Sequence, residues 1–110
     1  MGRYITTIGT AGATTREVST TYQAVVNDRI LANMASSAFT ITLPASSGAL
    51  TGDTVQIIDI AGNASSNNIT IGRNGAKING ATEDLVIDVA GAIVSLIYSG
   101  TTYGWIIGAV

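Results

Sequence analysis

The chain has 110 residues, a length typical of one domain. Charged residues make up only 11% of it, against about 25% in an average soluble domain, and the net charge is -2. It contains no histidine and no cysteine, which excludes a disulfide framework and the usual histidine-based catalytic and zinc sites. The basic residues are scattered and the apolar runs are short, so we expect neither a nucleic-acid partner nor a membrane partner.

Residues 1–19 predict an extended arm. This segment is rich in Thr, Gly and Ala, and its aliphatic content is limited to Ile5, Ile8 and Val18. A segment of this kind buries too little apolar surface to fold alone, so we expect it to become ordered on a partner. The alternative is a frayed terminus without a role. Residues 20–110 are predicted to form the folded β-domain. The residues predicted to attach the arm are Arg3, Tyr4, Ile5 and Ile8.

Alternating aliphatic residues predict strands along the rest of the chain. Phe39, Ile41 and Leu43 would share one face of a strand, and Pro44 would end it because proline cannot donate to a ladder. Further strands are expected at 54–60, 68–71, 85–89, 92–98 and 103–107. No segment has a capped helical stripe. The predicted fold class is therefore all-β, a compact antiparallel β-sandwich or barrel-like domain.

Two dipeptides indicate tight turns. Asn74-Gly75 and Asn79-Gly80 each suit a two-residue type I′ turn, in which both central residues need a positive φ. We expect the first pair to close a hairpin.

Several predicted strands are apolar on both faces, which an antiparallel sheet with one wet face does not need. The second apolar face would be covered by another sheet layer or by a neighbouring subunit. Low charge favours the neighbouring subunit, and we predict a homotrimer. The residues predicted to form its interface are Ile57, Ile58, Ile93, Leu96, Trp105, Ile106 and Ile107.

Carboxylates are the main remaining source of chemistry. Glu83 and Asp84 are adjacent and would point to opposite sides of a strand, whereas a glycosidase needs two carboxylates facing one cleft. Asp53 and Asp59 lie at the two ends of one predicted strand. We therefore predict no enzymatic activity, no catalytic residue, no cofactor and no metal site, although a structural calcium ion stays open. The neighbouring oxygen donors considered for calcium are Asn63, Asn67 and Asn68.

The order of short sequence pieces resembles a small β-domain of tailed-bacteriophage structural proteins, of the head-fibre, tail-fibre and capsid-decoration type. The pieces lie at 28–31, 39–45, 52–53, 55–59, 62–63, 67–71, 73–75, 78–80, 83–88, 96–98 and 104–105. The resemblance covers most of the chain from about residue 20 to 107.

This resemblance implies a homotrimeric virion protein. Because the chain contains little besides the module, it favours a capsid decoration (cement) protein, attached through its arm to the major capsid protein or another virion protein. We expect it on the capsid surface rather than the tail. The alternative is a small tail- or head-fibre tip that binds the host surface, against which an aromatic content of 5% argues.

Overall fold

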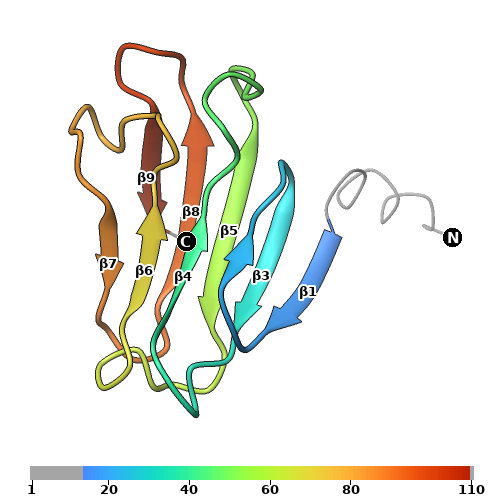
Figure 1. Cartoon of the computed structure of the whole chain (residues 1–110), viewed down its shortest axis with the longest axis vertical. Coiled ribbons are helices and arrows are strands. Elements are labelled where there is room, and N and C mark those ends of the chain that lie inside the picture. Colours follow the sequence, from blue (N-terminus) through green and yellow to red (C-terminus); the bar gives the residue numbers. More distant parts are fainter. Residues whose placement is uncertain (1–13, 110) are drawn as a thin grey trace, which may run out of the picture.

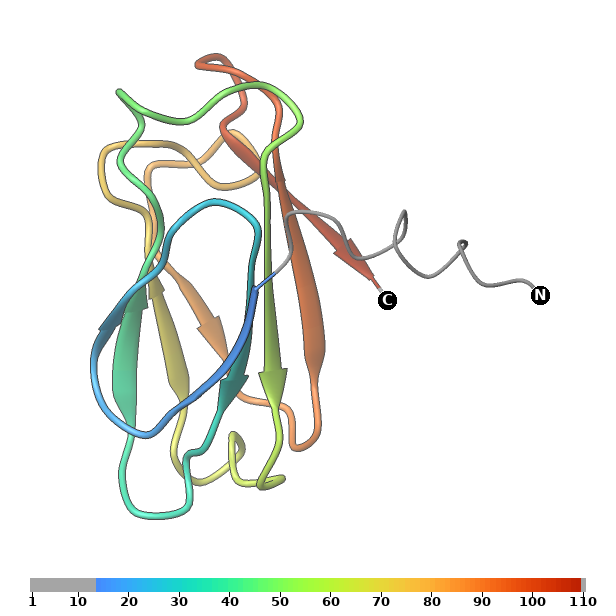
Figure 2. The ribbon, with the colours of Figure 1, turned by 90° about the vertical axis from the view of Figure 1, so that its right-hand side faces the viewer.

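The computed structural model describes residues 14–109, which form nine strands and no helix (Figure 1). The five-stranded sheet, sheet A, has the order β1 (Thr14–Val18), β3 (Asp28–Ala32), β5 (Thr54–Asp59), β8 (Ile93–Tyr98) and β9 (Trp105–Ala109). The four-stranded sheet, sheet B, has the order β2 (Tyr22–Gln23), β4 (Phe39–Thr42), β6 (Ile69–Gly72) and β7 (Leu85–Ile87). The all-β prediction is confirmed, and Figure 2 shows the two sheets as facing layers.

The strand directions differ from the predicted antiparallel arrangement. From β1 to β6 the chain alternates between sheet A and sheet B, and neighbours within each sheet run parallel. Parallel neighbours cannot be joined by a two-residue turn and need a long crossover. Here each crossover is itself a strand of the opposite sheet, so the chain winds as a short two-sheeted coil. Only β7, β8 and β9 add to the sheets antiparallel.

The hydrophobic core lies between the two sheets. Alternate residues of the longer strands point inward, as the burial of Val55, Ile57 and Asp59 on β5 shows. The largest fully buried side chain is Trp105, whose ring centroid lies 5.2 Å from that of Tyr98. The other large, fully buried side chains are Ile30, Met34, Ile41, Leu43, Ile57, Ile69, Ile71, Leu96 and Val55.

The N-terminal boundary is placed differently from the predicted arm of residues 1–19. Residues 1–13 lie outside the described part of the chain, but Thr14–Val18 pair with Asp28–Ala32 as the edge strand of sheet A. The sequence did not indicate this strand because its side chains are mostly exposed and apolar alternation is absent. The folded unit therefore begins earlier than residue 20.

Both predicted asparagine–glycine turns have positive φ at their two central residues. Asn74 and Gly75 have φ of 49° and 87°, and Asn79 and Gly80 have φ of 50° and 78°. The second pair closes a two-residue hairpin between Ile78 and Ala81. The first pair lies within the long loop that joins the antiparallel neighbours β6 and β7, so it does not by itself close a tight two-residue hairpin as predicted.

Gly104 is required by both its conformation and its surroundings. Its φ is +72°, and a Cβ there would overlap the backbone of Lys77. Gly62 has an equivalent φ of +71° with nothing near the position of its Cβ. We predict that Gly62→Ala lowers the free energy of unfolding by about 1 kcal/mol, the cost of the left-handed conformation alone. Gly104→Ala should cost roughly 2–4 kcal/mol because overlap with backbone is added.

Urea unfolding of the two variants and the wild type, at one protein concentration, measures this difference. Equal losses for Gly62→Ala and Gly104→Ala would show that the contact with Lys77 has no energetic weight.

Candidate interaction surface

The outer face of sheet A is the most apolar exposed region of the described strands. Two aliphatic groups lie on it: Leu31, Ile58 and Ile93 are neighbours in the strand register, and Ile97 pairs with Ile106. Ile93, Ile97 and Ile106 are 43%, 44% and 37% exposed. No other part of residues 14–109 covers this face. We call these five side chains the sheet A aliphatic face.

A row of hydrogen-bonded polar side chains runs between the two aliphatic groups. Arg29 donates from its guanidinium to Thr15 Oγ1 (3.3 Å) and from Nε to Gln56 Oε1 (3.1 Å). Gln56 Nε2 then donates to Ser95 Oγ (3.2 Å). The row crosses β1, β3, β5 and β8, and it satisfies polar groups within the face itself. Because these polar groups already bond to one another, a partner that covers them displaces few hydrogen bonds to water.

The outer face of sheet B has a different character. Thr40 pairs with Thr70, which pairs with Val86, and Thr42 pairs with Gly72 in the next row. Threonine hydroxyls bind water well, and Val86 is the single large apolar side chain of these two rows. The two faces of the sandwich are therefore unequal, and the sheet A aliphatic face is the better candidate for a contact with another protein.

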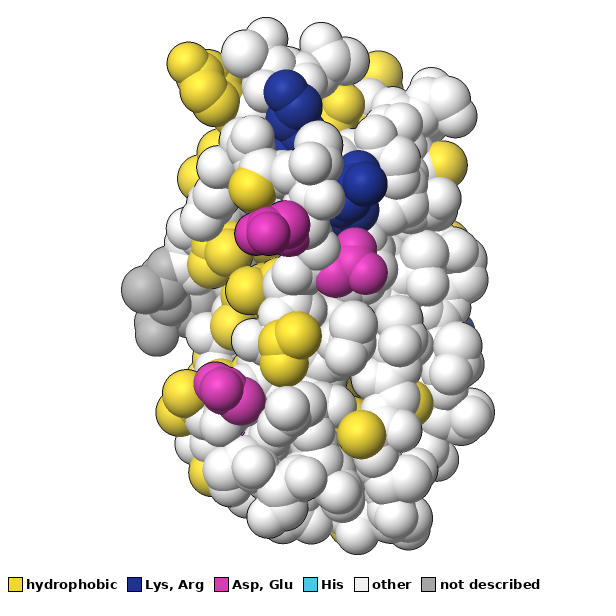
Figure 3. Space-filling view, turned by 60° about the vertical axis from the view of Figure 1, so that its left-hand side comes forward, with side chains coloured by type: hydrophobic (Ala, Val, Ile, Leu, Met, Phe, Trp, Pro, Cys, Tyr) yellow, Lys and Arg dark blue, Asp and Glu magenta, His cyan; other side chains and the backbone are white. Residues whose placement is uncertain are grey.

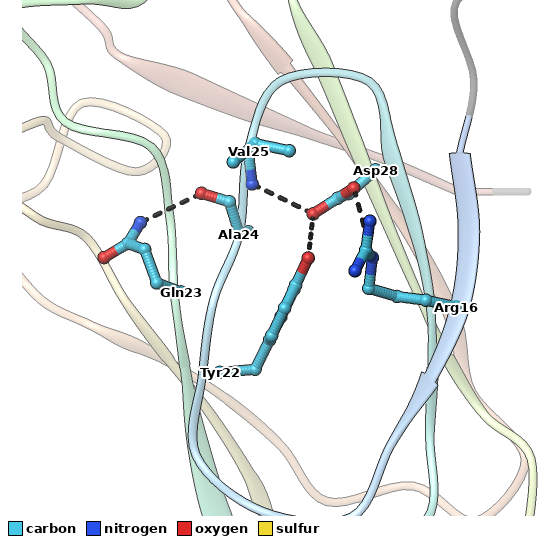
Figure 4. A network of polar contacts seen from close by, with 6 residues as sticks. All are labelled: Arg16, Tyr22, Gln23, Ala24, Val25 and Asp28. Carbon is cyan, nitrogen blue, oxygen red and sulfur yellow. Dashed lines mark hydrogen bonds and ion pairs between the residues drawn. The ribbon is translucent and has the colours of Figure 1, made fainter.

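A polar cluster lies at the edge of the sandwich where β1 and β2 are the outermost strands (Figure 4). Asp28, which is buried, accepts hydrogen bonds at Oδ2 from the Tyr22 hydroxyl (2.7 Å) and the Val25 N–H (2.9 Å). Arg16 lies over the Tyr22 ring, and its Nε is 3.9 Å from Asp28 Oδ1. Burial, followed by the bond to Asp28 and the charge of that carboxylate, raises the pKa of Tyr22 to about 12, although Arg16 opposes the shift. Tyr22 therefore stays neutral, and its hydroxyl links β2 to the first residue of β3.

A second buried carboxylate joins two connections of the fold. Asp59 ends β5, and its carboxylate accepts hydrogen bonds from the N–H groups of Asn63 (3.3 Å), Ala64 (2.9 Å) and Gly91 (2.9 Å). Burial alone would raise the pKa of Asp59, but the N–H groups of Gly91, Ala64, Asn63 and Gly62 together lower it below its ordinary value. Its oxygens are thus taken up by backbone donors.

The predicted trimer-interface residues fall into two groups. Ile57, Leu96 and Trp105 are fully buried in the chain's own core, so their side chains are not available to a second copy. Ile93 and Ile106 are exposed on the sheet A aliphatic face, Ile58 is half-buried there, and Ile107 packs against the core. In these strands one apolar face lines the core and the other lies on the outside. Sequence alternation distinguishes the two faces only when the register is known.

The polar row of Thr15, Arg29, Gln56 and Ser95 was not predicted. Each residue is an ordinary polar residue of a strand, and only the pairing of β1, β3, β5 and β8 brings the four together. The predicted attachment residues Arg3, Tyr4, Ile5 and Ile8 lie outside the described part of the chain.

Within the described residues, no three acidic side chains come together in a group able to hold a metal ion. Asn67, considered for calcium, instead donates from its side chain to the Met34 carbonyl oxygen (2.7 Å).

None of the residues described forms a helix that is long and apolar enough to cross a membrane.

Comparison with known proteins adds no relative: no protein-family model matches the chain, and no curated protein matches it significantly. The resemblance to the phage module therefore rests on the sequence pieces alone and stays a prediction.

The depressed pKa of Asp59 gives a pH-dependent contribution to stability. A carboxyl whose folded pKa lies below its unfolded value stabilises the fold above the unfolded pKa, and this stability is lost as the pH falls through the folded pKa. We predict that Asp59→Asn lowers the free energy of unfolding at pH 7 by roughly 1.5–3 kcal/mol, the range for hydrogen bonds to a charged group. The difference from wild type should shrink below about pH 4.

Asp88→Asn is the matched control, because Asp88 is exposed and makes no side-chain hydrogen bond among the described residues. Denaturant unfolding from pH 3 to pH 8 measures all three proteins. A loss for Asp59→Asn that stays constant across this range would contradict the assignment.

Proposed function

We propose that the protein is a non-enzymatic structural component of a tailed-phage virion, a trimeric decoration protein on the capsid surface. The observation that supports this proposal most directly is the uncovered sheet A aliphatic face. The protein has few charges, and one side of its sandwich carries Ile and Leu where a free monomer would carry polar residues.

The chemistry of this face favours a second copy of the chain as its partner. The charged side chains on the outer face of β1, β3, β5 and β8 are Glu17 and Arg29, and both make hydrogen bonds within the chain. These two charges are opposite in sign, so the face has no net charge to attract a strongly acidic or basic partner. A partner surface that is apolar and nearly neutral would match this face, and a second copy of the same face has these properties. Obligate interfaces of this kind resemble a hydrophobic core.

The proposed attachment to the capsid uses residues 1–13, which join the domain at the edge strand β1. Tyr4, Ile5 and Ile8 are the apolar residues proposed to contact the major capsid protein or another virion protein. Three arms on one trimer would bind together, so that each arm can be weak and the assembly still binds tightly.

The proposed trimer can be tested on the two unequal faces. Ile97 on sheet A is 44% exposed and Val86 on sheet B is 48% exposed, so an aspartate at either position is similarly tolerated by a monomer. We predict that Ile97→Asp weakens trimer association by about 100-fold or more, because it buries an unpaired charge in the interface. Val86→Asp should leave association unchanged.

Sedimentation or light scattering at low micromolar concentration measures the assembly. The wild type and Val86→Asp should have three times the chain mass, and Ile97→Asp should be mainly monomeric. A wild-type monomer, or trimers of all three proteins, would overturn the proposed interface.

The arm can be tested on virions stripped of the native protein. The boundary is given by β1: a chain that begins at Thr14 keeps this strand, whereas removal of residues 1–15 would damage sheet A. We predict that the chain beginning at Thr14 keeps the wild-type circular dichroism and assembly but fails to bind the particles. Full occupancy of the particles by the truncated chain would show that the domain carries the contact.

Arg3→Ala in the full chain tests the charge within the arm. If Arg3 pairs with an acidic patch of the particle, the binding constant of the wild type should fall more steeply with salt than that of the variant. Parallel salt dependences would exclude this role for Arg3.

A further inference from the structure

A small pocket lies at the loop end of the sandwich. Its volume is about 160 Å³, several times the roughly 30 Å³ of one water molecule. It is built from loops of both sheets. Its lining residues are Ser46, Arg73, Gly75, Ala76, Lys77, Thr82, Tyr98, Gly100 and Thr101.

Two basic residues line this pocket, and neither has an acidic partner among residues 14–109. Arg73 donates from its guanidinium to the Ala76 carbonyl oxygen (3.1 Å), which fixes its position and leaves its other N–H groups to bind elsewhere. Within the described residues, no carboxylate lies within 4.0 Å of the charged atoms of Arg73 or Lys77. The chain has only five basic residues, so the convergence of two of them on one pocket is a local positive site in a protein of net charge -2.

The remaining lining supplies hydroxyl donors and one buried polar side chain. Ser46, Thr82 and Thr101 contribute hydroxyls. Tyr98 is only 3% exposed, and its ring packs on Trp105 while the residue lines the pocket. Among the described residues the Tyr98 hydroxyl makes no hydrogen bond. This hydroxyl is therefore free to donate to an acceptor bound in the pocket.

Acidic residues lie beside the pocket but do not line it. Asp84 Oδ1 accepts a hydrogen bond from the Arg73 backbone N–H (3.1 Å), so this carboxylate is turned to the backbone. Figure 3 shows two basic side chains near the upper end of this face with acidic side chains next to them. The acids reduce the long-range attraction for anions, and binding must therefore depend on direct contacts inside the pocket.

We propose that this pocket binds a small oxyanion: a phosphate, sulfate or carboxylate group. The Arg73 guanidinium would donate a pair of N–H groups, the Lys77 ammonium would supply a second charge, and the hydroxyls would complete the donor set. Gly75 keeps the wall of the pocket open, because a Cβ there would lie 3.0 Å from Ser46 Oγ. This site is independent of the proposed trimer and capsid attachment.

The proposal can be tested by following backbone amide chemical shifts of the full chain during titration with sodium phosphate, acetate and chloride at constant ionic strength. Phosphate or acetate should produce saturable shifts at the pocket loops around Ser46, Arg73 to Lys77 and Thr101. A stronger response to phosphate assigns a tetrahedral oxyanion, and a stronger response to acetate assigns a carboxylate.

Three variants give the controls. Lys77→Gln removes one positive charge from the pocket and should weaken binding about 10-fold, and Tyr98→Phe, which keeps the ring on Trp105, should weaken it about 3-fold or more. Ser36→Asp changes the net charge by the same amount on an exposed loop outside the pocket lining, and it should leave affinity within about 2-fold. Linear shifts, equal saturation by chloride, or equal weakening by Lys77→Gln and Ser36→Asp would overturn the proposal.

Discussion

The fold depends on the rule that parallel neighbours in a sheet need a crossover. Because β1 to β6 alternate between the two sheets, each crossover is a strand, and the winding itself encloses the core. Asp59 is placed where this coil meets the antiparallel strands. It binds backbone N–H groups of the β5–β6 connection and of the turn before β8. This buried carboxylate thus adds a polar link between the two parts of the domain, beside the ladder from β5 to β8.

The same winding determines why the two outer faces differ. Each strand of the coil packs one side against the core. Only the alternate residues on its outer side can therefore be either polar or apolar. On β4 and β6 these residues are threonines and Gly72, and on β5 and β8 they include Ile58, Ile93 and Ile97. The core does not require these isoleucines. Their presence on one side only is more consistent with a contact between proteins than with a general preference for β-branched residues in strands.

Sequence reasoning located most of the longer strands and both asparagine–glycine turns, because alternation and left-handed φ are local properties. It could not give strand direction, since an alternating segment reads the same in a parallel or an antiparallel pair. It also failed to separate core from surface residues: it assigned both Ile57 and Ile58 to the interface, although Ile57 lies in the core. The polar row from Thr15 to Ser95 and the pocket at Arg73 and Lys77 both depend on register between distant segments, for which one sequence carries no signal.

The few charges of the chain are distributed so as to keep its surfaces distinct. Among the described residues, Arg16 is held by Asp28 and Tyr22, and Arg29 is held within the polar row of sheet A. Glu17 on the same face is opposite in sign to Arg29, so the face has no net charge to oppose the approach of an identical copy. Arg73 and Lys77 stand at the loop end, where a positive site does not interfere with that contact. Low overall charge is therefore compatible with two separate binding surfaces, one apolar and one basic.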